Sequence, residues 1–331
     1  MAEAMEARYW DAGEGHVDCR LCPWHCRIAP GKSGRCLVRR NEGGVLRAMT
    51  YGRVTSVSMD PIEKKPLYHF RPGSEILSVG SWGCNLSCLW CQNWTIAQQE
   101  VPTKEMGPAQ AVALAKEYAG QGNIGLAYTY NEPFIWFEYV YDTAKLAHEH
   151  GLVNVLVTNG IVEEEPLEEL LPYIDALNVD IKSMRDEFYQ RLTKGQAWPA
   201  RRTVEKAYGR AHVEITNLVV TGENDSDDDF RELAAWASSV SPKMPVHISR
   251  YFPACNFSAP ATPAETLVRA MEIISEKCEF VYVGNASLGA GSDTVCPKCG
   301  AVAVKRSGYR AEAKGLVEGR CRQCGEDLYF A

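Results

Sequence analysis

The chain has 331 residues, 46% of them hydrophobic, and a formal net charge of −7. This length allows one large domain with small added modules. The acidic balance gives no reason to expect nucleic acid or an acidic membrane surface as the main partner. The opening sequence MAEAMEARYW lacks the basic and apolar regions of a signal peptide, and no run approaches the ~20 apolar residues of a membrane span. We therefore expect a cytoplasmic protein without a membrane span.

The 13 cysteines are the most informative feature of the composition. In a reducing compartment disulfides are rare, so clustered cysteines are typical of metal sites. Two cysteines, Cys255 and Cys278, stand alone. The other cysteines form three groups: Cys19, Cys22, Cys26 and Cys36; Cys84, Cys88 and Cys91; and Cys296, Cys299, Cys321 and Cys324.

The first segment, residues 1–66, is rich in glycine and shows little periodicity, which predicts loops. Its four cysteines can close a tetrahedral zinc site or hold an auxiliary iron–sulfur cluster. Zinc would staple a small segment that has little core of its own, and we favour it over the cluster. His25 could replace one thiolate, but an exposed histidine between ligands is the simpler interpretation.

The stretch DPIEKKPLYHF (60–70) has two prolines and is expected to be a connector. From about residue 75 to 285, apolar strand-like runs alternate with helical patterns, which predicts an α/β fold with parallel strands. An open or partial (β/α) barrel fits this pattern, and a doubly wound sheet is the alternative. Either architecture binds ligands at the carboxyl ends of its strands. The expected strands are 75–82, 124–130, 152–159, 174–181, 211–220, 245–251 and 279–284, with helices at 108–120, 132–150 and 229–240.

The central motif is CNLSCLWC (84–91), directly after the first of these strands. Soft thiolates favour iron–sulfur clusters or zinc. A structural site normally closes its coordination with a fourth ligand, whereas a catalytic site leaves one position open. No fourth cysteine lies nearby, so the triplet predicts a cluster with an open iron. A zinc site completed by a distant residue is the alternative.

The C-terminal cysteines form two Cys-x2-Cys pairs, each followed by glycine. This pattern predicts a zinc ribbon, a closed site that we expect to be separable from the chemistry. It follows a Gly-rich linker at 288–293. Seven basic residues could contact an acidic partner, but a solvated surface is the simpler interpretation, and we do not expect nucleic acid binding. They are Lys298, Lys305, Arg306, Arg310, Lys314, Arg320 and Arg322.

Three further features have ordinary structural interpretations. We expect Cys278 and His247 in the core, and the aromatic run FIWFEYVY (134–141) on one buried helix face. Cys255 follows the sixth strand, so it could lie at the mouth of the site, although a partly buried structural cysteine is the preferred interpretation.

The Cys-x3-Cys-x2-Cys spacing after the first strand, with Trp90 before the last cysteine, resembles the radical S-adenosylmethionine superfamily. The resemblance implies a [4Fe-4S] cluster on the three cysteines. Its fourth iron would be chelated by the amino and carboxylate groups of S-adenosylmethionine. One-electron reduction would then cleave the sulfonium and give a 5′-deoxyadenosyl radical. A donor such as flavodoxin or ferredoxin would supply the electron.

Polar residues at the following strand ends extend the resemblance. YTYNEP (128–133) supplies a carboxylate, Glu132, where the superfamily often has a glycine-rich or polar segment, although the glycine run is missing here. VTNG (157–160) and VDIKS (179–183) resemble the T-N-G and D-x-K of pyruvate formate-lyase activating enzymes. The cofactor-binding candidates implied are Trp90, Glu132, Thr158, Asn159, Asp180 and Lys182.

Longer stretches resemble one subgroup, the AmmeMemoRadiSam type. They are CRLCPWHCRIAPGKSGRC (19–36), DPIEKKPLYHF (60–70) and SWGCNLSCLWCQNW (81–94), together with YTYNEP and VDIKS. The resemblance implies a partial (β/α)6-type barrel. The expected division is a Cys-rich metal-binding segment at 1–66, the barrel at 67–290 and the zinc ribbon at 291–331.

Three functions are compatible with the sequence. The first is a radical enzyme that acts on an unidentified small molecule or lipid precursor. The second is an activase that abstracts hydrogen from a glycine of a partner protein. The third is a non-catalytic zinc-ribbon binding protein with a degenerate barrel, which the intact triplet and the polar strand ends disfavour. We therefore expect an oxidoreductase that uses S-adenosylmethionine.

Overall fold

The computed structural model describes residues 4–286 and 291–331. Within these ranges the largest sheet has eight strands in the order β16-β15-β14-β13-β12-β11-β9-β8. Strands β9 and β11–β16 run parallel, and β8 (Ser56–Pro61) is antiparallel to β9. No pairing joins β8 to β16 in the described residues, so the barrel is partial, as predicted. The parallel strands are β9 (Glu75–Gly80), β11 (Asn123–Tyr128), β12 (Val153–Thr158), β13 (Ala176–Asp180), β14 (His212–Val219), β15 (Val246–Arg250) and β16 (Val281–Gly284).

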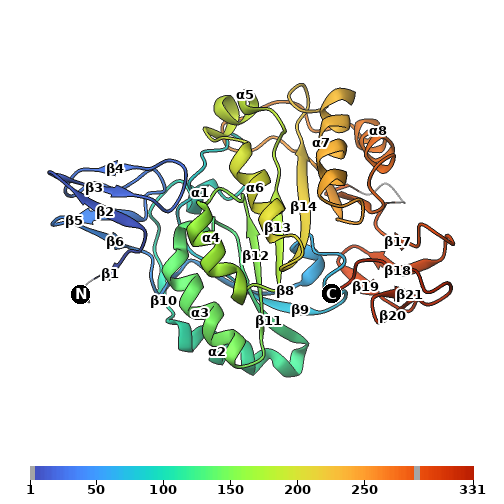
Figure 1. Cartoon of the computed structure of the whole chain (residues 1–331), viewed down its shortest axis with the longest axis horizontal. Helices are drawn as coiled ribbons and strands as arrows, with labels where there is room; N and C mark the ends of the chain where they lie inside the picture. The colour runs from blue at the N-terminus through green and yellow to red at the C-terminus, as the bar shows by residue number, and fades with distance from the viewer. Residues whose placement is uncertain (1–3, 287–290) are drawn as a thin grey trace.

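Helices alternate with the parallel strands and pack around the sheet (Figure 1). The predicted burial of the aromatic run of η3 and α3 is confirmed, and it extends over almost the whole run rather than one helix face. Ser226 caps α7 by accepting a hydrogen bond from the Asp229 amide. The α-helices are α1 (Trp94–Ala97), α2 (Pro108–Glu117), α3 (Phe137–Glu149), α4 (Glu164–Leu170), α5 (Asp186–Phe188), α6 (Trp198–Ala207), α7 (Asp227–Val240) and α8 (Ala264–Ser275). The shorter helical turns are η1 (Ile62–Lys64), η2 (Tyr118–Gln121), η3 (Phe134–Trp136), η4 (Leu171–Tyr173) and the π-type η5 (Tyr189–Thr193).

The N-terminal segment contains short antiparallel strands where the sequence predicted loops (Figure 1). They have two to four residues each, too few for a clear alternating pattern. A buried ion pair at 2.9 Å between Arg39 and Glu138 of α3 fastens this segment to the barrel. The strands are β1 (Met5–Glu6), β2 (Trp10–Gly13), β3 (His16–Cys19), β4 (Arg27–Ile28), β5 (Arg39–Glu42), β6 (Val45–Ala48) and β7 (Arg53–Val54), the last paired with β10 (Lys104–Glu105).

The segment between β8 and β9 packs into the interior of the barrel. Ile62, Leu67 and Phe70 pack against Ile76 of β9 and inward-facing residues of β11–β13. The expected connector is therefore also part of the barrel core. Because β8 already belongs to the main sheet, the proposed division at residue 66 leaves one strand of that sheet on its N-terminal side.

The C-terminal module packs closely against the barrel. Tyr68, Phe280 and Tyr282 share one buried cluster with Cys296 and Leu328. Of the linker expected at 288–293, residues 288–290 lie outside the described residues. The strands are β17 (Thr294–Val295), β18 (Val302–Ser307), β19 (Arg310–Glu312), β20 (Leu316–Val317) and β21 (Arg320–Cys321).

Hydrogen bonds from the chain end fasten this module to the segment under the barrel. The buried His69 ring contacts the Leu328 carbonyl at 2.8 Å, and the Ala331 amide donates to the His69 carbonyl at 3.0 Å. Arg306 is buried, with its guanidinium over the Tyr68 ring, so it belongs to this contact rather than to an open basic surface. These buried contacts argue against the expected separability of the ribbon.

We predict that truncation after Gly291 destabilises the barrel. The truncation exposes Tyr68, Phe280 and Tyr282, and burial of a single large apolar side chain is worth roughly 1.5–3 kcal/mol, so the loss should exceed about 3 kcal/mol. Urea unfolding followed by circular dichroism measures it. Lys243→Ala is the control, because it removes only partly exposed polar contacts with Glu326 and Asp327 and should cost at most about 1 kcal/mol. A truncated chain as stable as the full chain would show that the ribbon is independent.

Candidate active site

The loop that carries Cys84, Cys88 and Cys91 follows β9 and is held by its own apolar residues. Leu86 and Trp90 are buried against Phe188 and Tyr189, beyond the end of β13. The Ser87 and Leu89 amides donate to carbonyls at the end of η5, at 2.9 and 3.0 Å. The loop therefore has a defined conformation around its three thiols.

The three cysteines line one cavity of about 590 Å³ at the carboxyl ends of the parallel strands. All the predicted cofactor-binding residues line the same cavity: Trp90, Glu132, Thr158, Asn159, Asp180 and Lys182. They meet there because parallel strands all end at one edge of the sheet. Among the described residues that line this cavity, the triplet supplies the only thiols.

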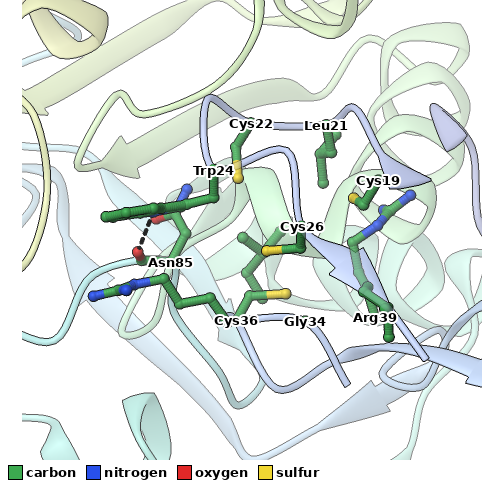
Figure 2. Close-up of a pocket in the computed structure, with 12 residues that line it drawn as sticks. Cys19, Leu21, Cys22, Trp24, Cys26, Gly34, Cys36, Arg39 and Asn85 are labelled. Atoms are coloured by element: carbon green, nitrogen blue, oxygen red, sulfur yellow. Dashed lines mark hydrogen bonds between the residues drawn. The ribbon is translucent and has the colours of Figure 1, made fainter. Parts of the chain in front are cut away.

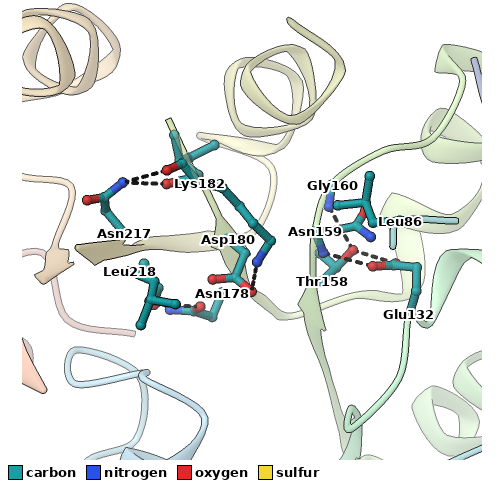
Figure 3. A network of polar contacts seen from close by, with 12 residues as sticks. Leu86, Glu132, Thr158, Asn159, Gly160, Asn178, Asp180, Lys182, Asn217 and Leu218 are labelled. Atoms are coloured by element: carbon teal, nitrogen blue, oxygen red, sulfur yellow. Dashed lines mark hydrogen bonds and ion pairs between the residues drawn. The ribbon is translucent and has the colours of Figure 1, made fainter. Parts of the chain in front are cut away.

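Glu132 is buried and joins the ends of β11 and β12 (Figure 3). It accepts hydrogen bonds from the Thr158 hydroxyl at 2.6 Å and the Asn159 amide at 2.8 Å. The Phe134 amide donates a third bond at 2.9 Å. Burial raises the pKa of Glu132 to about 7, although these three donors oppose the shift. The carboxylate therefore fixes the neighbouring strand ends.

Asp180 and Lys182 form an ion pair at 2.9 Å after β13 (Figure 3). Burial alone would lower the pKa of Lys182, but the Asp180 carboxylate and the neighbouring Cys88 raise it overall. The lysine thus carries its positive charge beside the cysteine triplet. Its amide also donates to the Tyr189 hydroxyl at 3.0 Å, which ties this turn to the π-type helix.

Asn159 connects the third strand end with the cysteine loop. Its side-chain amide donates to Asn85 Oδ1 at 2.9 Å and lies 3.6 Å from the Cys84 sulfur. Asn85 in turn donates to the Ile161 carbonyl at 2.7 Å. The T-N-G turn therefore supports the loop as well as lining the cavity.

The sequence analysis did not identify the floor of the cavity. Lys64 and Lys65 reach it from the segment under the barrel, and both ammonium groups lie 2.7 Å from Asp60 carboxylate oxygens. The Tyr130 hydroxyl donates to Asp60 at 2.6 Å. Despite burial, these bonds lower the pKa of Asp60. Two adjacent lysines within the expected connector were the available signal.

The remaining cysteines occupy distinct environments. The ribbon sulfurs all lie within 4.8 Å of one another, with Cys296–Cys324 and Cys299–Cys321 each at 3.6 Å, which fits a closed metal site. Cys278 is buried, as expected, whereas Cys255 is exposed rather than partly buried. His247 is buried and hydrogen-bonded to Glu214 at 2.6 Å, which fits the expected core role.

The fold and site define an α/β protein with a partial parallel barrel and an open three-thiolate site at its carboxyl end. The family model of the radical SAM superfamily matches residues 80–237. An uncharacterised protein of Methanocaldococcus jannaschii is 41% identical over 99% of both chains. Pyruvate formate-lyase 1-activating enzyme of Escherichia coli is 27% identical over 51% of this chain and 71% of its own length.

A solved structure shares the fold. Streptococcus suis SuiB bound to S-adenosylmethionine aligns with a TM-score of 0.53 at 13% identity, over 69% of this chain and 53% of SuiB. The chain belongs to the radical SAM superfamily, and it is homologous to pyruvate formate-lyase activating enzymes. Members of this superfamily are generally enzymes, and the domain implies S-adenosylmethionine and an iron–sulfur cluster. Three soft thiolates around an open cavity fit such a cluster.

We predict that Glu132→Leu destabilises the protein without its metals by roughly 1.5–3 kcal/mol, because three buried donors lose a charged acceptor. Urea unfolding of the metal-free protein measures the change. Glu132→Gln is the control, since it keeps one carbonyl oxygen in place and should lose less. Equal stability of Glu132→Leu and wild type would show that the carboxylate does not stabilise the strand ends.

Proposed function

We propose that this protein is a radical SAM enzyme that reductively cleaves S-adenosylmethionine and abstracts hydrogen from an unidentified substrate. The observation that carries the proposal is the packed loop with three thiols at the edge of a cavity lined by polar strand ends, where the described lining residues include no fourth thiol. When bound, a [4Fe-4S] cluster and S-adenosylmethionine supply a 5′-deoxyadenosyl radical. A one-electron donor such as flavodoxin or ferredoxin provides the reducing electron in this cytoplasmic oxidoreductase.

The residues that line the cavity each have a role in the proposal. Cys84, Cys88 and Cys91 hold the cluster, and Trp90 anchors their loop in the core. The ammonium of Lys182, beside the triplet, offers a charge-assisted hydrogen bond to the carboxylate of S-adenosylmethionine, and Asp180 positions that ammonium. Glu132 fixes Thr158 and Asn159 at the cavity wall.

The ribbon has a structural part in this proposal. Its four sulfurs have the spacing that one tetrahedral zinc requires, and closed coordination leaves no position for chemistry. A zinc ion there would hold the chain end against His69 and so support the segment that carries Lys64 and Lys65 to the cavity floor.

The second candidate is an activase that forms a glycyl radical on a partner protein. The homology to the Escherichia coli activating enzyme over 71% of that enzyme favours it. Both candidates share the cleavage of S-adenosylmethionine and differ in whether the hydrogen comes from a small molecule or from a peptide glycine.

We predict that the anaerobically reconstituted protein with reductant converts S-adenosylmethionine to 5′-deoxyadenosine, and that Cys88→Ala abolishes this. The variant removes one of three thiolates, so the cluster cannot be held with a single open iron. Chromatography of the nucleoside products measures the conversion. Cys278→Ala is the matched control, since this buried cysteine lies in the core outside the cavity lining. Persistent turnover by Cys88→Ala would show that the triplet is not required for cleavage of S-adenosylmethionine.

We predict that Lys182→Ala weakens S-adenosylmethionine binding while cluster absorption persists. Loss of one charge-assisted hydrogen bond costs roughly 1.5–3 kcal/mol, or about 10- to 150-fold in Kd. Equilibrium dialysis with labelled S-adenosylmethionine gives the Kd. Lys116→Ala, an exposed position on α2, should bind like wild type. An unchanged Kd in Lys182→Ala would mean that this lysine does not contact the cofactor.

A further inference from the structure

The four N-terminal cysteines surround one pocket (Figure 2). Cys19 ends β3, Cys22 and Cys26 lie in the next loop, and Cys36 precedes β5. Their neighbours in the lining include the apolar side chains of Leu21, Ile28 and Ile135. Four thiols that converge from separate turns onto an apolar pocket form a metal site rather than a chance cluster.

The spacing of the sulfur atoms distinguishes between metals. Four thiolates on one zinc, each about 2.3 Å from it, lie within about 4 Å of one another. The ribbon cysteines meet this condition, with two sulfur pairs at 3.6 Å. Among residues 4–286 and 291–331, no three of the four N-terminal sulfurs come within 4.8 Å of one another, and the same holds for the active-site triplet. The N-terminal set is therefore more widely spaced than the ribbon site, as the active-site triplet also is.

The wider spacing also distinguishes between cluster types. In a two-iron cluster two thiolates share each iron, so two sulfur pairs would be as close as those in the ribbon. In the described residues the ribbon makes two such sulfur–sulfur contacts, whereas Cys19, Cys22, Cys26 and Cys36 form neither a sulfur–sulfur hydrogen bond nor a disulfide. In a four-iron cubane each thiolate binds its own iron, which keeps all four sulfurs apart. The geometry thus fits a cubane.

A buried donor at the pocket gives independent support. Arg39 lines the pocket and is 1% exposed, and its Nε has no hydrogen-bond partner within the described part of the chain. An unsatisfied buried N–H costs about 1–3 kcal/mol unless a ligand accepts from it. The thiolates and bridging sulfides of an iron–sulfur cluster are such acceptors, so a bound cluster would satisfy this N–H.

We propose that Cys19, Cys22, Cys26 and Cys36 bind a second [4Fe-4S] cluster, with Arg39 Nε as a donor to it. The sequence favoured zinc here, because zinc would staple a segment with little core of its own, and the sulfur geometry reverses that preference. The site is also built against the active-site loop. Trp24 Nε1 donates to the Asn85 carbonyl at 2.9 Å (Figure 2), and a Cβ on Gly83 would lie 2.5 Å from the Cys36 carbonyl oxygen. The two cysteine sets thus belong to adjoining loops.

The test is metal analysis of the full-length protein after anaerobic reconstitution with iron, sulfide and zinc. The decisive variant is the triple Cys84→Ala/Cys88→Ala/Cys91→Ala, which leaves the N-terminal segment intact. It should retain about four irons and about four sulfides per chain, with a Mössbauer spectrum of the [4Fe-4S] type. Wild type should hold about eight irons and about eight sulfides.

The matched variant removes the other site. Cys22→Ala/Cys26→Ala should retain about four irons, those of the active-site triplet. Arg39→Lys, which keeps a positive charge beside Glu138, should keep the iron but shift the midpoint potential of the N-terminal cluster, since the Nε donor to sulfur is lost. A triple variant that binds about two zinc ions and no iron would overturn the proposal. A triple variant with about two irons would overturn the cubane assignment.

Discussion

The parallel alignment of the seven barrel strands is the constraint on which the site depends. Each strand brings its carboxyl end to the same edge, so residues far apart in sequence meet there. Cys84, Glu132, Asn159 and Lys182 follow four consecutive strands and line one cavity. The strands hold this alignment because their apolar side chains pack on both faces of the sheet, against helices outside and against Ile62, Leu67 and Phe70 inside.

The number and spacing of the thiols distinguish the ribbon cysteines from the active-site triplet. The ribbon has four close sulfurs and a closed site, which suits a structural metal. The triplet has three thiols on a packed loop beside a cavity, which leaves room for a cofactor. Both peripheral modules are fastened to the barrel by buried polar contacts, Arg39 with Glu138 and His69 with Leu328. None of the helices in the described ranges has the length and apolar character that a membrane span requires.

Much of the barrel and its site could be predicted from local sequence. The seven apolar runs became β9 and β11–β16, because buried parallel strands need continuous apolar residues. The polar residues after those runs line one cavity because the parallel strands all end at the same edge of the sheet. The short N-terminal hairpins were missed, since strands of two to four residues carry too little periodicity. The contact of His69 with Leu328 joins residues 259 positions apart and has no local pattern that could reveal it.

The central claim is that the cysteine triplet holds a cluster whose open iron binds S-adenosylmethionine. The most direct measurement is electron–nuclear double resonance of the reduced, reconstituted protein with S-adenosylmethionine labelled with nitrogen-15 in its amino group and oxygen-17 in its carboxylate. The account predicts hyperfine coupling from both labels to the cluster, lost in the Cys84→Ala/Cys88→Ala/Cys91→Ala variant. A reduced cluster on the triplet with no coupling to either label would contradict it.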